Sequence, residues 1–156
     1  MSSTNEEAIS AFLQFAVDGS FEKVKQCLDK GNVHIDSINN NGSTALMCAA
    51  WKGHEKICDL LITRGCKADM QNNNGSTALM FAASNGHEKI CDLLITRGCK
   101  ADMQNKNGST ALMMAADNGH EGVCDLLITR GCKADMQNNN GDTALMCAAE
   151  NGHEGV

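Results

Sequence analysis

A 33-residue repeat accounts for most of this chain of 156 residues. Near-identical copies occupy residues 42–74, 75–107 and 108–140, and a shorter copy occupies 141–156. A fixed period of this length is typical of solenoids, in which each copy is one supersecondary unit that packs on its neighbours. The repeat therefore predicts an elongated stack with an extended surface for another macromolecule, rather than a globule with a catalytic cleft.

Each full copy combines two short helical patterns with one segment that lacks helical periodicity. In the first copy, residues 44–52 are rich in alanine, begin at the potential N-cap Thr44 and end before Gly53. Residues 54–64 carry apolar residues at helical spacing, and residues 66–75 end in an Asn-Gly pair typical of a hairpin-like turn. Helices shorter than about 12–15 residues are marginal alone in water, so stacking must supply the stability.

The composition narrows the range of partners and compartments. The net charge is -6 without any basic run, so the chain offers no electrostatic footprint for nucleic acid or an anionic membrane. No segment approaches the roughly 20 apolar residues of a membrane span, and the first twenty residues lack the pattern of a secretory signal. The nine cysteines are odd in number and recur with the repeat, which favours buried thiols in a cytoplasmic or otherwise intracellular protein.

The motif within each copy resembles that of the ankyrin-repeat family. Residues 74–87 read Asn-Gly-Ser-Thr-Ala-Leu-Met-Phe-Ala-Ala-Ser-Asn-Gly-His, and the copies keep one register over essentially Phe12 to Val156. The resemblance implies an all-α solenoid of stacked helix-turn-helix units with hairpin-like finger loops. There are two departures, because alanine replaces the family's proline after threonine and methionine replaces its histidine after leucine. We expect the helix start to survive and the methionine to fill the gap between repeats.

The two ends of the array differ from the central copies. Residues 11–41 form a degenerate repeat whose polar residues suit an N-terminal cap. Residues 141–156 contain the first helix of a repeat but lack most of the second. We therefore expect a single ankyrin-repeat array over residues 1–156 that continues in a longer native chain. An uncapped C-terminal repeat could also associate end to end with another copy.

Reactive chemistry has several candidate residues, each with a plainer explanation. Histidine and cysteine lie four residues apart, on one helix face, in the pairs His54/Cys58, His87/Cys91 and His120/Cys124. Two ligands per repeat are too few for a metal centre, so we expect a core cysteine and a turn histidine instead.

A lysine that would favour the thiolate follows Cys66, Cys99 and Cys132, although packing between repeats is the alternative. No nucleotide-binding or nucleophile motif occurs, and we expect no enzyme activity, metal or cofactor.

The family resemblance implies instead that a partner protein binds on the finger tips and the inner helix ends. The corresponding positions are Asn40, Asn41, Ser43, Trp51, Lys52, Asn73, Asn74, Ser76, Ser84, Asn85, Lys106, Asn107, Ser109, Asp117, Asn118, Asn139, Asn140, Asp142, Glu150 and Asn151. The first two copies differ at only four positions, and three of them (Trp51/Ser84, Lys52/Asn85 and Asn73/Lys106) belong to this set. A recognition surface on a copied scaffold would show such variation, whereas free drift of surface residues is the alternative.

Trp51 is the most informative of these positions, because it is the only tryptophan and falls at an inner helix end. A single exposed tryptophan is a typical interface anchor, although shielding of the finger stems is the alternative. Lys52 lies toward the N-terminal end of the array, whereas Asp117, Asp142 and Glu150 lie toward the other end, and Lys106 interrupts this gradient. We expect a partner with an apolar contact at Trp51 and basic or donor-rich groups farther along.

Taken alone, the sequence predicts a protein-interaction module, such as a scaffold or targeting arm. Two alternatives stay open. One is the non-catalytic arm of an enzyme or of a ubiquitin-ligase adaptor, and the other is a structural spacer without a specific ligand.

Overall fold

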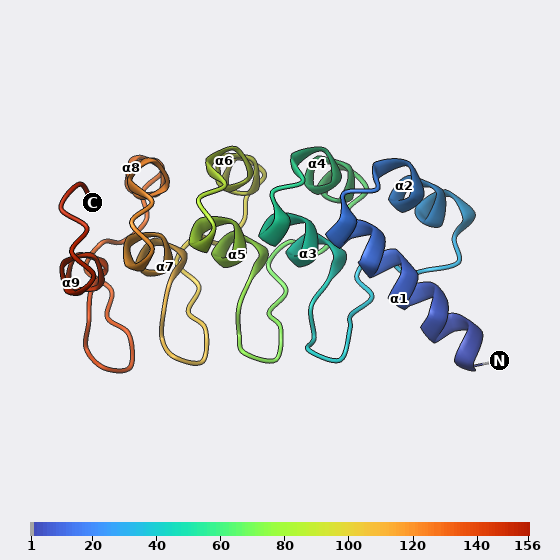
Figure 1. Ribbon diagram of the computed structural model, residues 1–156, viewed down its shortest axis with the longest axis horizontal. Helices are drawn as coiled ribbons and strands as arrows, with labels where there is room; N and C mark the ends of the chain where they lie inside the picture. Colours follow the sequence, from blue (N-terminus) through green and yellow to red (C-terminus); the bar gives the residue numbers. More distant parts are fainter. Residues whose placement is uncertain (1) are drawn as a thin grey trace.

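Two rows of helices and a row of loops make up residues 2–156, the part of the chain that this computed structural model describes (Figure 1). The inner row consists of α1 (Ser2–Asp18), α3 (Ala45–Lys52), α5 (Ala78–Ser84), α7 (Ala111–Asp117) and α9 (Ala144–Glu150). The outer row consists of α2 (Phe21–Lys30), α4 (Glu55–Thr63), α6 (Glu88–Thr96) and α8 (Glu121–Thr129). Long loops, the fingers, lead from each outer helix to the next inner helix and project to one side (Figure 1). The predicted all-α solenoid is confirmed.

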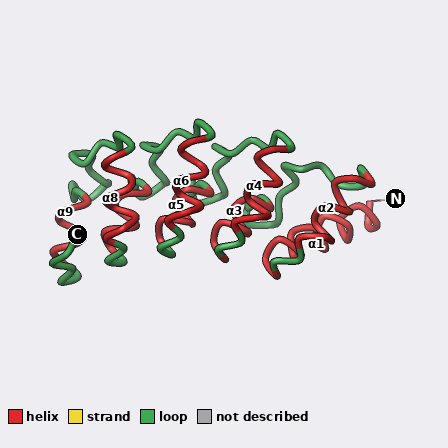
Figure 2. The backbone as a smooth tube through the Cα atoms, turned by 90° about the horizontal axis from the view of Figure 1, so that it is seen from above, coloured by secondary structure: helices red, strands yellow, loops and turns green. Residues whose placement is uncertain are grey.

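Each repeat packs on its neighbours in the sequence. Inner helices contact the next inner helix in the order α1, α3, α5, α7 and α9, and α1, α3, α5 and α7 each contact the outer helix that follows them. Seen from above, the helix pairs lie side by side in one series (Figure 2). Within residues 2–156, extended backbone pairs only at one isolated bridge, between Ile38 and Thr44, so the fingers are loops rather than a sheet.

Threonine begins the inner helix of each of the four copies. The Oγ1 atom of Thr44 accepts a hydrogen bond from the backbone N–H of Met47 at 3.3 Å, and the other three copies repeat this bond at 3.3–3.4 Å. The N-cap role predicted for Thr44 is therefore confirmed. The helix starts without the family's proline, because the threonine side chain already satisfies a free backbone donor.

Small and flexible side chains fill the space between repeats. Ala49 and Ala50 are fully buried, which allows neighbouring inner helices to approach closely. Met47, Met80 and Met113 are also buried, as expected for methionines that fill the gap between repeats. The core of the array is therefore continuous from one repeat to the next.

A histidine follows the inner helix in each of the four copies and contacts the preceding repeat; in the first three copies it also begins the outer helix α4, α6 or α8. The distance from its Nε2 atom to a carbonyl oxygen is 2.9 Å for His54 and Val17, and 3.0 Å for His87/Trp51, His120/Ser84 and His153/Asp117. The glycine that ends the inner helix of the preceding repeat leaves room for the histidine ring. A Cβ atom on Gly86, where φ is +74°, would lie 2.7 Å from Nδ1 of His120. Each Gly-His pair therefore takes part in two contacts between repeats. Its glycine leaves room for the histidine of the following repeat, and its histidine contacts a carbonyl group of the preceding repeat.

The N-terminal helix is longer than the sequence motif predicts. Helix α1 has 17 residues and begins at Ser2, whereas the degenerate repeat is expected to begin at residue 11. Phe12, Leu13 and Ala16 are buried and anchor α1, which packs on α3. The preceding turns carry exposed Glu6 and Glu7 and match no repeat motif, so the pattern could not reveal them. They extend the inner wall of the array beyond the other inner helices.

Candidate protein-binding surface

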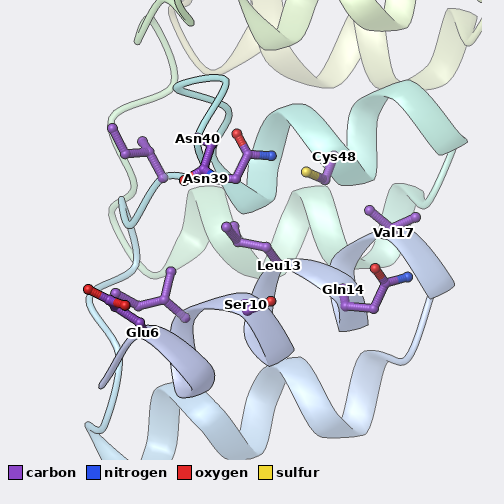
Figure 3. A pocket seen from close by; sticks show the side chains of 10 residues that line it. Glu6, Ser10, Leu13, Gln14, Val17, Asn39, Asn40 and Cys48 are labelled. Atoms are coloured by element: carbon purple, nitrogen blue, oxygen red, sulfur yellow. The ribbon is translucent and has the colours of Figure 1, made fainter. Parts of the chain in front are cut away.

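A concave face lies where the inner helices meet the fingers. One hollow of about 490 Å³ separates α1 from the first finger, and a second of about 440 Å³ lies along α3 and the first two fingers. Val17, Asn39 and Cys48 line both hollows, which therefore form one continuous depression, here called the N-terminal groove. Leu13 and Val17 from α1 face the same space as Asn39, Asn40 and Cys48 in the first hollow (Figure 3).

Trp51 lines the second hollow and keeps 45% of its surface exposed. The ammonium of Lys52 lies 3.9 Å from the centroid of the Trp51 ring, a cation–π contact that covers part of the indole. The tryptophan therefore neither sits in the core nor projects freely. It forms an apolar wall of the groove beside a single positive charge.

Apolar residues that the sequence did not single out also line the groove. Ile38 on the first finger is 50% exposed and borders the first hollow. Phe81 on α5 lines the second hollow together with Trp51. Of the four differences between the first two copies, Phe81 is the one that sequence reasoning left out of the surface set. The variation itself was the signal, because core positions are otherwise identical between these copies.

The finger positions are mostly exposed, and several also bind the neighbouring finger. Exposed tips comprise Asn40, Asn41, Asn73, Asn74, Lys106, Asn107, Asn139 and Asn140, whereas Ser43, Ser109 and Asp142 are half-buried. The Nδ2 atom of Asn73 donates to the carbonyl of Asn40 at 2.9 Å, and that of Asn139 donates to the carbonyl of Lys106 at 2.8 Å. The asparagine-rich fingers are therefore partly a structural ladder that holds the wall of the groove.

Ser76 does not belong to the surface and corrects the predicted set. It is only 7% exposed, and its backbone N–H donates to Oδ1 of Asn72 at 2.9 Å. The equivalent bond is present at Ser43 and Ser109, which are half-buried, so this bond alone does not account for the burial of Ser76. Its counterpart Ser43 in the first copy is less covered.

The inner helix ends present a row of exposed polar side chains after Trp51. Trp51, Lys52, Asn85, Asp117, Asn118, Glu150 and Asn151 are exposed, and Ser84 is half-buried. Asn118 donates from Nδ2 to the carbonyl of Met114 at 2.8 Å and to Ser84 Oγ at 3.3 Å. Asn151 donates to Asp117 Oδ1 at 2.8 Å. These asparagines therefore close helix ends, while Asp117 and Glu150 give the C-terminal half of the face a negative charge.

The repeated histidine–cysteine pairs are parts of the fold. As described above, each of these histidines contacts a carbonyl of the preceding repeat, while Cys58, Cys91 and Cys124 are buried. Residues described by the structure include no cluster of three or more histidine, cysteine or acidic side chains able to hold a metal ion. The buried thiols pack as small apolar groups, as the repeat pattern predicts.

The thiols that precede lysine are not activated. Burial, followed by the nearby Asp36 carboxylate, raises the pKa of Cys66 to about 12. Burial and Asp69 likewise raise the pKa of Cys99 to about 12. Burial first, and then the neighbouring carboxylates, therefore disfavour a thiolate at Cys66 and Cys99, which supports packing between repeats.

Alkaline pH should weaken the fold through these thiols. The ordinary thiol pKa of 9.0 applies to the unfolded chain, whereas burial raises the pKa of Cys58 and Cys91 to about 12 in the folded chain. The unfolded chain therefore loses thiol protons first, and stability falls as the pH rises from about 9 to about 12. We expect a lower urea midpoint at about pH 10.5 than at about pH 7.5. A Cys58→Ala/Cys91→Ala variant should show a smaller decrease, and equal decreases would disprove this explanation.

Comparison with known proteins establishes the family. Residues 1–72, 52–137 and 79–156 each match a family model described as ankyrin repeats in three copies. Together these matches cover the whole chain, which therefore belongs to the ankyrin-repeat family. Ankyrin repeats are protein-interaction modules and are generally non-catalytic.

Two curated relatives share part of the array. "Inactive serine/threonine-protein kinase TEX14" of Mus musculus is 36% identical over 62 residues, which make up 40% of this chain and 4% of that protein. The Bos taurus protein of the same name is 35% identical over 66 residues, 42% of this chain and 4% of its own length. The chain thus matches only a small part of these relatives. Across residues 2–156, none of the helices is both long and apolar enough to cross a membrane.

Proposed function

We propose that this chain binds a partner protein on its concave face, through the N-terminal groove, the finger tips and the inner helix ends. The observation that carries this proposal is the groove itself, because it combines half-exposed Trp51 and Ile38 with an amide-rich finger wall. Interfaces are enriched in such aromatic anchors, surrounded by polar groups. The extended stack supplies the surface, and no reactive group in it requires an enzymatic explanation.

The pattern of differences between copies also supports this face. The position of Trp51 is occupied by Ser84, Asp117 and Glu150 in the other copies, so it changes in size and charge from repeat to repeat. By contrast, the buried leucines and alanines between repeats are the same in every copy. Two outer-helix positions also vary, with Lys56 and Ile57 corresponding to Gly122 and Val123 in the third copy. Most of the varying positions nevertheless lie on the face that a partner would touch, as selection for a partner predicts.

Affinity capture from a cell lysate tests the proposal with two matched triple variants. The first, Trp51→Ala/Asp117→Ala/Glu150→Ala, removes one aromatic and two acidic side chains from the concave face. The second, Ile128→Ala/Asp125→Ala/Glu121→Ala, removes one apolar and two acidic side chains, all exposed, from the outer helix α8. Circular dichroism should show the same fold for all three proteins.

We expect the parent and the α8 variant to capture the same protein, and the concave-face variant to lose it. Loss of a central aromatic anchor typically weakens binding at least about tenfold. Equal capture by all three proteins would remove the concave face from the explanation and favour the structural spacer. Loss with the α8 variant alone would place the binding surface on the outer helices.

The wider role that we propose is a scaffold or targeting arm within a longer intracellular protein. The matched relatives are far longer than the shared segment, which supports an array that serves as one part of a larger chain. A non-catalytic arm of an enzyme or of a ubiquitin-ligase adaptor is the second form of this proposal. Identification of the captured partner would distinguish these forms.

Self-association through the last helix is a further candidate role. Leu145 and Met146 on α9 are 69% and 49% exposed, whereas their counterparts Leu112 and Met113 are each 3% exposed beneath the next repeat. We propose that two copies of residues 1–156 cover this apolar face mutually, whereas in a longer chain a further repeat would cover it instead. Sedimentation velocity should then show a concentration-dependent dimer that the Leu145→Glu variant loses. A monomer at every concentration would exclude this association.

A further inference from the structure

The aromatic residues of the repeats are concentrated in one place. Among residues 42–156 the only aromatic residues are Trp51 and Phe81, and both line the second hollow of the N-terminal groove. They occupy different positions within the repeat, and neither position is aromatic in any other copy. The two substitutions thus build one aromatic pair in a scaffold that is otherwise aliphatic. Such a pair can hold a flat or ring-shaped apolar group between neighbouring inner helices.

The inner helices set the spacing at which a ligand can use these side chains. Equivalent positions on successive inner helices carry Cys48, Phe81, Met114 and Cys147, one apolar side chain per repeat. Packed helices lie roughly 8–10 Å apart. A polyproline II segment presents the same face every third residue, about 9 Å along its axis. A β-strand returns to the same face after about 7 Å, which does not match this spacing.

The finger wall offers hydrogen-bond donors that suit the same conformation. The Oδ1 atom of Asn39 accepts from the backbone N–H groups of Asn41 and Ser43, both at 3.0 Å. Asn72 makes the equivalent two bonds at 3.0 and 2.9 Å. Both asparagines line the groove, and their Nδ2 groups find no acceptor within residues 2–156. An α-helical ligand has its carbonyl groups bonded internally, whereas a polyproline II segment leaves its carbonyl groups free to accept.

The charges on the concave face determine the direction in which a bound segment lies along it. In the last turns of the inner helices, Lys52 lies over Trp51 at one end, and Asp117 and Glu150 are exposed on α7 and α9 beyond Phe81. Glu6 in the first hollow and Lys106 on a finger tip depart from this order. Basic ligand residues are therefore repelled at the Trp51 end and attracted at the far end. The apolar contacts and the acidic positions lie along one row of helices, so a single extended segment can reach both.

We infer that the N-terminal groove binds a proline-rich segment of a partner protein in the polyproline II conformation. This inference rests on the proposed function, since it specifies what the concave face holds. Apolar or proline residues occupy every third position of the segment, against Cys48 on α3, Phe81 on α5 and Met114 on α7, and Trp51 flanks the first of these contacts. Lysine or arginine follows at the end that reaches Asp117 and Glu150.

Selection from a displayed peptide library tests this inference and does not require the natural partner to be identified first. The probe is a library of random peptides of about 15 residues, longer than the roughly nine that span α3 to α9 in this conformation. The bait is the full chain. The comparison bait is the Trp51→Ser/Phe81→Met variant, in which both residues take the identity found at the same position in another copy, Ser84 and Met114. This variant should fold normally because the scaffold already accommodates both side chains.

We expect the full chain to enrich peptides with apolar or proline residues at positions i, i+3 and i+6 and basic residues at one end. A selected peptide should bind the variant at least about tenfold more weakly. Moving its apolar residues to alternate positions should weaken binding to the full chain by a similar factor.

Three outcomes would overturn the inference. Enriched peptides with the helical i, i+4, i+7 pattern that also need Trp51 would refute the polyproline II conformation and leave the proposed function standing. Enriched peptides that bind parent and variant equally would refute both. Failure to enrich any peptide would refute binding of a short segment, and the lysate capture would then decide the proposed function on its own.

Discussion

Replacing Gly86 with alanine should destabilise the array by about 3 kcal/mol, one of the largest effects expected from adding a single methyl group. The residue has φ of +74°, which costs an L-residue roughly 1–2 kcal/mol. Its new Cβ atom would also lie 2.7 Å from the His120 ring. The ring must then move and weaken its contact with the carbonyl of Ser84, which adds about 1 kcal/mol or more. Urea unfolding measures this loss.

Gly98 provides the matched control for this prediction. It also ends a helix with a positive φ, +91°, but an added Cβ atom would meet nothing within 4 Å. Gly98→Ala should therefore lower the free energy of unfolding only through the unfavourable positive φ, by about 1–2 kcal/mol. A His120→Ala substitution should remove most of the extra cost of Gly86→Ala, because the two residues share one contact. Equal losses for Gly86→Ala and Gly98→Ala would show that the histidine contact adds nothing to stability.

Replacing Phe12 with alanine should destabilise the array by about 3–5 kcal/mol, the cost of emptying a fully packed aromatic site. Phe12 has no exposed surface and anchors α1, the helix that covers the first repeat. Because repeats are stabilised mainly by their neighbours, loss of this cap should lower the unfolding midpoint of the whole N-terminal half. Far-ultraviolet circular dichroism during urea titration would follow this change.

Phe81→Ala, unlike Phe12→Ala, should change the stability of the array little but weaken binding of the partner. Phe81 is only partly buried, and the other copies hold cysteine or methionine at its position without loss of the fold. We expect a stability change of about 1 kcal/mol or less, together with weaker binding of the partner. A loss of stability as large as that of Phe12→Ala would mean that Phe81 belongs to the core and not to the groove.

Much of the fold could be predicted from the sequence, because helix boundaries and buried positions inferred in one copy can be compared with those in the other copies. The start of the inner helix at threonine could be predicted from one copy and checked in three others. The burial of the methionine holds for Met47, Met80 and Met113 but not for Met146 in the last copy. The early start of α1 at Ser2 could not, since those turns have no repeated counterpart. For a helix that occurs once, the sequence supplies only the helix propensity of its residues. For a helix that occurs in four copies, the alignment of the copies also indicates where it begins and ends.

The candidate surface was only partly predictable. Exposure of Trp51 follows from its place at a helix end. Burial of Ser76 does not follow from the repeat pattern, because Ser43 and Ser109 at the same position are half-buried. The groove lining by Ile38 and Phe81 depends on the angle between fingers and helices, which a periodic pattern does not encode. The raised pKa of Cys66 results from burial and then from Asp36, a residue of another finger that sequence spacing did not connect to it.

The fluorescence of Trp51 tests the binding role of the groove most directly. Trp51 is the only tryptophan, so its emission reports on the groove alone. The captured partner, or a peptide selected from the library, would be titrated while a separate label on the ligand reports total binding. If the groove is the binding site, the emission should shift to shorter wavelengths in parallel with the label, because the ligand excludes water from the half-exposed indole. Complete binding by the label with unchanged Trp51 emission would contradict the assignment.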